Sequence, residues 1–229
     1  MTSDANDANP VQIYLFRHGE TDWNRERRFQ GHTDIPLNDL GREQARALLE
    51  SMRELKLQVI LTSDLLRAKE TAQILNAELK LPLIISSELR ECRIGDPEGK
   101  LRESIIAEYG SLAWDRWLSV KAEDHEHGFP NGETKSDHLK RLIKFVEAYC
   151  KENPKHKRIA ISTHGGSVRR LVHHCVNAPV EPIPLPNCAL YEVSFNLESG
   201  SWVYVRSVSG SADRQTSVLD ANVWGKTKD

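Results

Sequence analysis

The sequence predicts an α/β protein, specifically a three-layer α/β/α sandwich with a mostly parallel central sheet. Short apolar runs alternate along the chain with segments whose apolar residues recur at helical spacing, and this alternation is typical of a parallel sheet covered by helices on both faces. The chain has 229 residues, of which 39% are hydrophobic, and this is enough to form a full core. A helical insertion and a C-terminal edge hairpin complete the predicted fold.

The first half of the chain contains three predicted strands, at residues 11–16, 59–61 and 81–85. The first strand is followed by a polar loop and by a helix over residues 38–55, whose first residue is an asparagine suited to the N-cap position. Ser63 is expected to cap the helix that follows the second strand. Strand and helix therefore alternate twice before the third strand.

The second half begins with residues 96–156, which contain helical patterns and no strand pattern, and we interpret them as a helical insertion that forms a cap. A fourth strand at residues 158–162 and an amphipathic helix follow. Residues 189–195 and 202–208 flank a turn in which Gly200 is expected at positive φ. These two segments are predicted to pair as a hairpin at the edge of the sheet.

We expect one catalytic domain over residues 11–209, between a polar N-terminal segment (1–10) and a polar C-terminal tail (210–229). The first ten residues lack the apolar stretch of a signal peptide, and no run of about 18 apolar residues occurs. The 31 basic and 33 acidic residues are spread along the chain and give a net charge of −2, so nothing points to nucleic acid or to a membrane surface. The 4 cysteines form no metal or disulfide pattern, and we expect a cytoplasmic protein.

Two histidines are expected at the same edge of the sheet. Arg17-His18-Gly19 follows the first strand, and His164-Gly165-Gly166 follows the fourth. The carboxyl ends of parallel strands lie together at one edge, which is where open α/β sheets bind ligands. Arg67, one turn into the helix after the second strand, and Glu91, after the third strand, are expected to face the same point.

Arginine, histidine and glycine in this arrangement suit a tetrahedral dianion. Guanidinium groups make charge-assisted bidentate bonds, glycine leaves backbone amides accessible, and a helix N-terminus adds an oriented dipole. The implied ligand is a phosphoryl group. A carboxylate beside it would repel the dianion unless it takes part in the chemistry, so Glu91 is expected to be the general acid that protonates a leaving oxygen.

These motifs resemble the histidine phosphatase superfamily, also called phosphoglycerate mutase-like, over roughly residues 11–195. The matching segments, in chain order, are Arg17-His18-Gly19-Glu20-Thr21 with Trp23-Asn24, Gln30-Gly31 with Asp34, Pro36-Leu37 and Gly41, Ser63-Asp64-Leu65-Leu66-Arg67-Ala68 with Thr71-Ala72, Leu89-Arg90-Glu91 with Gly95 and Glu98-Gly99, Gly132-Glu133-Thr134, and Ser162-Thr163-His164-Gly165-Gly166. The third block departs from the family pattern, because Pro97 stands where a tryptophan is usual.

The resemblance implies a mechanism without a metal or another cofactor. His18 would attack phosphorus and become phosphohistidine, while Glu91 would protonate the leaving oxygen and later deprotonate water. Arg17, Arg67 and His164 would hold the phosphoryl oxygens. The further residues that the resemblance assigns to phosphate or substrate binding are Asn24, Gln30, Gly31 and Gly165. His18 must present an unprotonated nitrogen whereas His164 serves best protonated, so their pKa values should differ.

Phosphatase chemistry on a small phosphate ester is the favoured function. The mutase branch of the family typically has glutamine where this chain has Glu20, and an arginine pair in the insertion where this chain reads Trp114-Asp115-Arg116-Trp117-Leu118-Ser119. A cofactor-dependent phosphoglycerate mutase and a catalytically silent phosphate-binding module are the alternatives. The physiological substrate and the oligomeric state stay open.

The other histidines and arginines are interpreted without a functional role. His125-Glu126-His127 has no evident third metal ligand and is interpreted as an exposed loop. His173-His174 occupies adjacent helical positions that face different directions. The side chains of Arg25, Arg27 and Arg28 are interpreted as solvated, with contact to an anionic substrate at the pocket mouth as the alternative.

Overall fold

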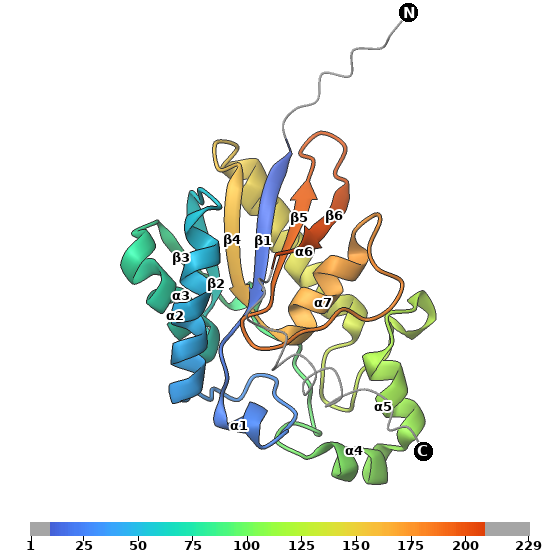
Figure 1. Cartoon of the computed structure of the whole chain (residues 1–229). Helices are drawn as coiled ribbons and strands as arrows, with labels where there is room; N and C mark the ends of the chain where they lie inside the picture. Colours follow the sequence, from blue (N-terminus) through green and yellow to red (C-terminus); the bar gives the residue numbers. More distant parts are fainter. Residues whose placement is uncertain (1–9, 209–229) are drawn as a thin grey trace, which may run out of the picture.

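A computed structural model describes residues 10–208, which form one six-stranded sheet in the order β3-β2-β4-β1-β5-β6 (Figure 1). The strands are β1 (Val11–Arg17), β2 (Val59–Ser63), β3 (Leu83–Ser86), β4 (Arg158–Thr163), β5 (Leu190–Phe195) and β6 (Trp202–Ser207). The first four are mutually parallel, whereas β5 runs antiparallel to β1 and β6 antiparallel to β5. The mostly parallel sheet and its C-terminal edge hairpin are therefore confirmed. Residues 1–9 of the predicted N-terminal segment (1–10) and the whole predicted C-terminal tail (210–229) lie outside the described residues.

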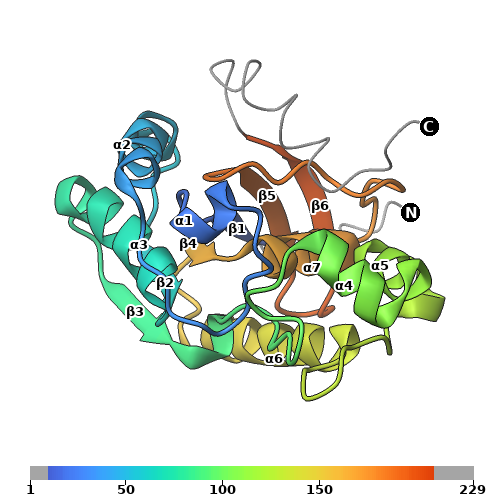
Figure 2. The same ribbon diagram turned by 90° about the horizontal axis from the view of Figure 1, so that it is seen from below.

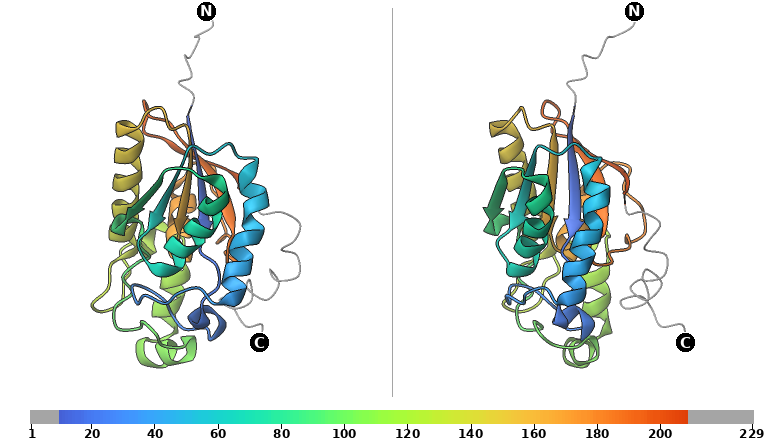
Figure 3. Two further views of the ribbon diagram at one scale, coloured as in Figure 1. Left: turned by 90° about the vertical axis from the view of Figure 1, so that its left-hand side faces the viewer. Right: turned by 60° about the vertical axis from the view of Figure 1, so that its left-hand side comes forward.

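Helices cover both faces of the sheet (Figures 2 and 3). The α-helices are α1 (Asp22–Arg25), α2 (Asp39–Arg53), α3 (Leu66–Leu79), α4 (Arg102–Tyr109), α5 (Ser111–Leu118), α6 (Lys135–Glu152) and α7 (Gly165–His174), with short 3-10 turns η1 (Ser87–Leu89) and η2 (Ala122–Asp124). Tyr14 and Phe16 of β1 pack with α2 and α3, while Ile13 and Leu15 pack with α6 and α7. Successive strand residues point to opposite faces, so an apolar run such as β1 can support both layers.

The helix predicted at residues 38–55, which is α2, begins as predicted, whereas the helix that follows β2 does not. The side chain of Asn38 accepts a hydrogen bond from the amide of Gly41 (2.8 Å) and caps α2. Ser63 stays within β2, and α3 begins at Leu66. The amide of Leu66 donates to Asp34 Oδ1 (2.6 Å). The carboxylate of Asp34, from the loop before α2, therefore accepts a hydrogen bond from the N-terminal amide of α3, the role that was predicted for Ser63.

The predicted insertion over residues 96–156 is too long, because its last helix belongs to the central fold. In α6 the side chains of Leu142, Val146 and Cys150 recur every four residues and are fully buried against the sheet and α7. Of the α-helices in this segment, α4 and α5 are the two that lie beyond the carboxyl ends of the strands, around a separate apolar cluster that includes Trp114 (Figure 1). An amphipathic pattern shows that a helix has a buried face and does not show what covers it.

The outer strand β3 begins two residues later than predicted and exposes Ile84 and Ile85. Gly200 lies in the β5–β6 turn with φ of 71°, as expected. Among residues 10–208, the structure contains no helix whose length and apolar character would let it cross a membrane.

Candidate active site

The carboxyl end of the sheet and the α4–α5 region together enclose a cavity of about 330 Å³. His18, Arg67 and Glu91 line it on the sheet side, and Trp114 and Trp117 on the side of α5. The sequence therefore predicted correctly that the residues after β1, β2 and β3 converge.

The hydrogen bonds of His18 define which of its nitrogens can react. His18 Nδ1 lies 2.7 Å from the carbonyl oxygen of Gly19. A carbonyl only accepts, so Nδ1 carries the hydrogen and Nε2 keeps its lone pair. Burial, followed by the positive charges of Arg67 and Arg17, lowers the pKa of His18 well below 6.5. The expected unprotonated nitrogen is thus present at neutral pH.

Gly19 is required after His18 because the loop passes directly against the start of α2. A Cβ atom on Gly19 would lie 2.3 Å from the carbonyl oxygen of Gly41, and one on Gly41 would lie 2.1 Å from that of Glu20. Neither clash can be relieved by a side-chain rotation, because the atoms met are backbone. The spacing between these glycines in the sequence therefore reflects backbone packing that holds His18 at the end of β1.

His164 lies beside His18, with the ring centroids 5.3 Å apart, but it is not protonated as predicted. Arg67 Nε donates to His164 Nδ1 (3.2 Å), and His164 Nε2 lies 3.0 Å from the hydroxyl of Ser63. A guanidinium cannot accept, so Nδ1 has no hydrogen and Nε2 donates to the serine. Burial and the charge of Arg67 lower the pKa of His164 well below 6.5. The pKa values of His18 and His164 are therefore both shifted downward, because both rings share the same buried, cationic surroundings.

Arg67 is almost completely buried, with 1% of its surface exposed. Its NH1 group donates to the carbonyl of Thr33 (3.0 Å) and its NH2 group to that of Gly31 (2.6 Å). Burial lowers its pKa to about 10, which still leaves it charged at neutral pH. Gly31 is not among the residues that line the cavity; its carbonyl orients Arg67 instead.

Arg17, Asn24 and Gln30 all line the cavity, as the sequence predicted. Arg17 NH1 donates to the carbonyl of Leu185 (2.5 Å). Asn24 Oδ1 accepts from the amide of Thr21 (3.2 Å) and from Asn187 Nδ2 (3.2 Å).

With its oxygen engaged in this way, Asn24 keeps its amide NH₂ as the group that can donate to a ligand. Asn187 also donates to the carbonyl of His18 (3.1 Å). Its side chain therefore connects the two loops that carry His18 and Asn24, a role that the sequence analysis missed.

The carboxylate of Glu91 is held by two backbone amides. Oε2 accepts from Gly166 at the start of α7 (2.7 Å), and Oε1 accepts from Cys92 (2.8 Å). A Cβ atom on Gly166 would lie 2.5 Å from Glu91 Oε1, which explains why a second glycine follows Gly165. The predicted general acid is thus fixed in the cavity against the N-terminus of α7.

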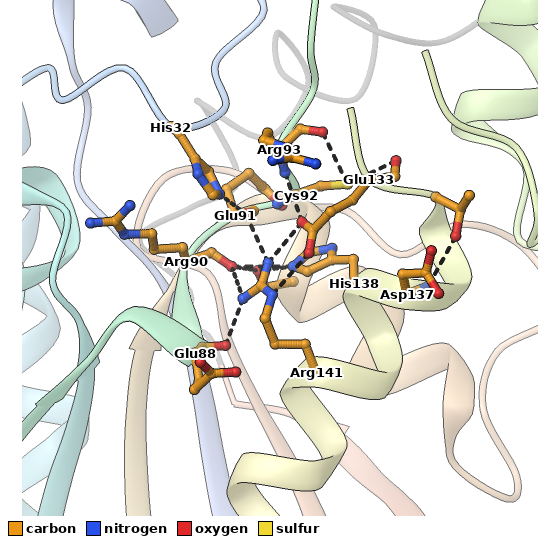
Figure 4. Close-up of polar contacts among 12 residues, drawn as sticks. His32, Glu88, Arg90, Glu91, Cys92, Arg93, Glu133, Asp137, His138 and Arg141 are labelled. Carbon is orange, nitrogen blue, oxygen red and sulfur yellow. Dashed lines mark hydrogen bonds and ion pairs between the residues drawn. The ribbon is translucent and has the colours of Figure 1, made fainter. Parts of the chain in front are cut away.

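Arg141 of α6 holds the backbone that carries Glu91 (Figure 4). Its guanidinium donates to the carbonyls of Glu88 (2.7 Å), Arg90 (3.3 Å) and Glu91 (3.2 Å). The same group pairs with both oxygens of Glu133 at 3.0 and 2.9 Å. Glu133 belongs to a motif found in the sequence, whereas Arg141, two helical turns further on, was not identified.

We expect Arg141→Met to lower the free energy of unfolding by about 1 to 3 kcal/mol, because three carbonyls and Glu133 lose a charged donor. The loss of turnover should be larger for alkyl phosphates than for aryl phosphates, since a displaced Glu91 protonates the leaving group poorly. Urea denaturation and rates on both substrate types measure the two effects. Lys144→Met, on an exposed position of the same helix, is the matched control. Equal losses on both substrate types would show that Arg141 does not act through Glu91.

Further basic residues line the cavity. The sequence analysis interpreted some of them without a functional role, with substrate contact by Arg28 as the alternative, and did not consider the others. His125, His173, His174 and Arg28 belong to the first group. The second group consists of Lys135, Arg169 and Arg170. The sequence did contain a signal for the last two, because helical spacing from His164-Gly165-Gly166 places residues three and four positions later on the same side of α7. No cluster of three potential metal ligands occurs among residues 10–208.

The sequence model of the histidine phosphatase superfamily (branch 1) matches residues 13–208. The chain belongs to this superfamily. Its members transfer phosphoryl groups, so the protein is a phosphoryl-transfer enzyme that acts on small phosphorylated substrates. The fold predicted from the alternation of strands and helices agrees with the fold of solved members of this superfamily.

Relatives within the histidine phosphatase superfamily carry both mutase and phosphatase names. The chain is 36% identical over 172 residues to phosphoglycerate mutase-like protein 4 of Arabidopsis thaliana (73% of this chain, 72% of the relative). It is 33% identical over 196 residues to the probable phosphoglycerate mutase GpmB of Salmonella arizonae (84% and 88%). The structure of a mycobacterial glucosyl-3-phosphoglycerate phosphatase, solved with VO3, is similar with a TM-score of 0.76 and 25% identity, covering 87% of this chain and 100% of that one.

Proposed function

We propose that this histidine phosphatase superfamily member is a metal-independent phosphomonoesterase, with His18 as the nucleophile and Glu91 as the proton donor. The observation that carries the proposal is the tautomer of His18, whose hydrogen bond to Gly19 leaves Nε2 unprotonated in a cavity that Arg17, Arg67 and Glu91 also line. An imidazole nitrogen with a free lone pair is the form that can attack phosphorus.

The proposed reaction has two steps. His18 Nε2 forms a bond to phosphorus as the ester P–O bond breaks, and Glu91 gives its proton to the leaving alkoxide. Glu91 then takes a proton from water, whose oxygen attacks phosphorus as the N–P bond breaks and inorganic phosphate forms. The negative charge on the phosphoryl oxygens must be stabilised by positive groups throughout the transfer. We assign that role to the guanidinium groups of Arg17 and Arg67.

Neutral donors complete the proposed phosphate site. The NH₂ group of Asn24 and the backbone amide of Gly165 would bind phosphoryl oxygens, and the N-terminus of α7 adds its dipole. Gln30 would contact the substrate beside Asn24. Gly31 would act indirectly through the carbonyl that orients Arg67, and His164 would act in the same way through Arg67 Nε.

Two contacts favour hydrolysis over mutase chemistry. Glu20 Oε1 accepts from Asn38 Nδ2 (2.8 Å), so this side chain supports the start of α2. Arg116, the single arginine of α5, pairs with Asp124 (3.2 Å) and does not line the cavity. The helix α5 therefore contributes no cation to the cavity, and the arginine pair that the mutase branch carries in its insertion has no counterpart there. The mutase reaction remains the alternative because of the names of the relatives.

The test is turnover of p-nitrophenyl phosphate in the presence of EDTA, together with incubation of the protein with 3-phosphoglycerate. We expect aryl phosphate hydrolysis at a rate that EDTA leaves unchanged, and release of inorganic phosphate as the product from 3-phosphoglycerate. Formation of 2-phosphoglycerate without phosphate release would identify a mutase. Inactivity in both assays would contradict both enzymatic functions and favour a phosphate-binding module.

A further inference from the structure

Two neighbouring arginines of α7 face the cavity without an acceptor or a counter-charge bound to them among the described residues. Arg169 and Arg170 both line it, and neither makes a hydrogen bond or an ion pair with any residue between 10 and 208. The Nε atoms of both side chains are buried and lack an acceptor. A buried guanidinium is costly unless an anion or carbonyl oxygens compensate it. The pair therefore calls for an anionic partner from outside the chain.

The remaining cations of the cavity are already accounted for. Arg28 pairs with Glu26 (2.6 Å), and Arg17 and Arg67 both donate to backbone carbonyls. Lys135 Nζ donates to the carbonyls of Arg116 (2.7 Å) and Ser119 (2.6 Å). Within the described part of the chain, Glu91 is the one carboxylate side chain that lines the cavity. One phosphoryl dianion at His18 would therefore leave a surplus of positive charge on the α7 side.

Arg170 lies between the proposed general acid and the aromatic wall. Arg170 NH1 and Glu91 Oε1 both lie close to Gly166. A Cβ atom built on Gly166 would be 2.6 Å from the first and 2.5 Å from the second. The guanidinium carbon of Arg170 lies 4.9 Å from the ring centroid of Trp117. The stacked ring fixes the plane of the guanidinium and leaves its edge available for an anion. Arg169 lies beside it, where burial and the charge of Arg170 lower the Arg169 pKa to about 10.

We propose that Arg169 and Arg170 bind a second anionic group, a carboxylate or a phosphate, on the alcohol half of the substrate. The inference rests on the proposed function, because Glu91 marks the leaving oxygen and Arg170 extends from Glu91 into the leaving-group side of the cavity. The preferred substrates are phosphate monoesters whose alcohol carries this second charge close to the ester oxygen. Trp117 and Phe29, which are 5.4 Å apart between ring centroids, line the apolar wall beside it.

The experiment compares kcat/KM for three phosphate esters of a three-carbon alcohol. Glycerol 3-phosphate has no second charge, 3-phosphoglycerate has a carboxylate, and glycerol 1,3-bisphosphate has a second phosphate. We expect the wild-type protein to favour one or both charged esters over glycerol 3-phosphate by about 10- to 100-fold, the range of a charge-assisted contact. The charged ester with the larger kcat/KM shows whether the second anionic group is a carboxylate or a phosphate.

The variant Arg169→Met/Arg170→Met should remove this preference by lowering kcat/KM more for the charged esters than for glycerol 3-phosphate. Arg53→Met, which removes an exposed arginine paired with Glu78, is the matched control and should keep it. If the double variant does not fold, the single variant Arg170→Met is measured in the same way. Two results would overturn this inference and leave the proposed phosphatase function intact. The first is aryl phosphate turnover by a wild-type protein that shows no preference among the three esters. The second is an equal loss of kcat/KM on all three esters in the variants. Absence of turnover on every ester would instead contradict the proposed phosphatase function.

Discussion

Replacing His18 by alanine is expected to lower turnover of p-nitrophenyl phosphate by about 10⁴-fold or more, the scale seen when a covalent nucleophile is removed. The cavity retains Arg17 and Arg67 in the variant, so phosphate esters should still bind. No other histidine nitrogen in the described chain is held next to both arginines with its lone pair unused. Quenching with ³²P-labelled substrate should therefore detect acid-labile phosphohistidine in the wild type and none in His18→Ala.

His156→Ala is the control for loss of a histidine, because His156 bonds to Tyr149 (2.8 Å) and does not line the cavity. It should retain wild-type labelling and turnover. Persistent acid-labile label in His18→Ala would show that another residue accepts the phosphoryl group. In that case His164, whose pKa is lowered in the same way, would be the next residue to test.

Replacing Glu91 by glutamine is expected to slow the breaking of the ester bond in alkyl phosphates much more than in aryl phosphates. An alkoxide needs a proton as the P–O bond breaks, so turnover of alkyl phosphates should fall by about 10²- to 10⁴-fold. A p-nitrophenolate is stable without protonation, so label should still accumulate on His18 from the aryl ester. Because Glu91 also acts in the second step, hydrolysis of that intermediate should become slow. Burst kinetics with p-nitrophenyl phosphate measure both steps.

Glu91→Gln keeps the size of the side chain but cannot accept with both terminal atoms, so one of its bonds to Gly166 or Cys92 is lost. Urea denaturation separates this structural cost from the chemical one. Glu78→Gln, on the surface beside Arg53, is the matched control and should not discriminate between leaving groups. Wild-type rates on alkyl phosphates in Glu91→Gln would require a different general acid.

The apolar runs and the capping residue in the sequence were sufficient to predict the main strands and the start of α2, because each has a direct physical cause. The apolar run of β1 is buried on both faces, and its length and position were predicted to within one residue. The asparagine before α2 caps that helix because its side-chain oxygen reaches the third amide along. Since strand ends in a parallel sheet share an edge, the positions of His18, Arg67 and Glu91 followed from chain order alone.

The errors arose where the outcome depends on what packs against an element. Nothing in the apolar stripe of α6 distinguishes a helix on the sheet from one in a cap, and α6 proved to cover the sheet. The protonation of His164 depends on the atoms within hydrogen-bond distance, and Arg67 Nε occupies the nitrogen that a proton would need. Both outcomes are set by contacts between residues far apart in the chain.

The sequence by itself determined the α/β fold and the convergence of His18, Arg17, Arg67 and Glu91, because apolar periodicity and the succession of elements along the chain are properties of the sequence. The superfamily followed from the resemblance of its motifs. The tertiary structure alone decided the tautomers of the two histidines, the support of Glu91 by Arg141, and the placement of Arg169 and Arg170 in the cavity. Hydrogen-bond geometry and burial depend on three-dimensional neighbours, and these also determine where a charge is left without a partner.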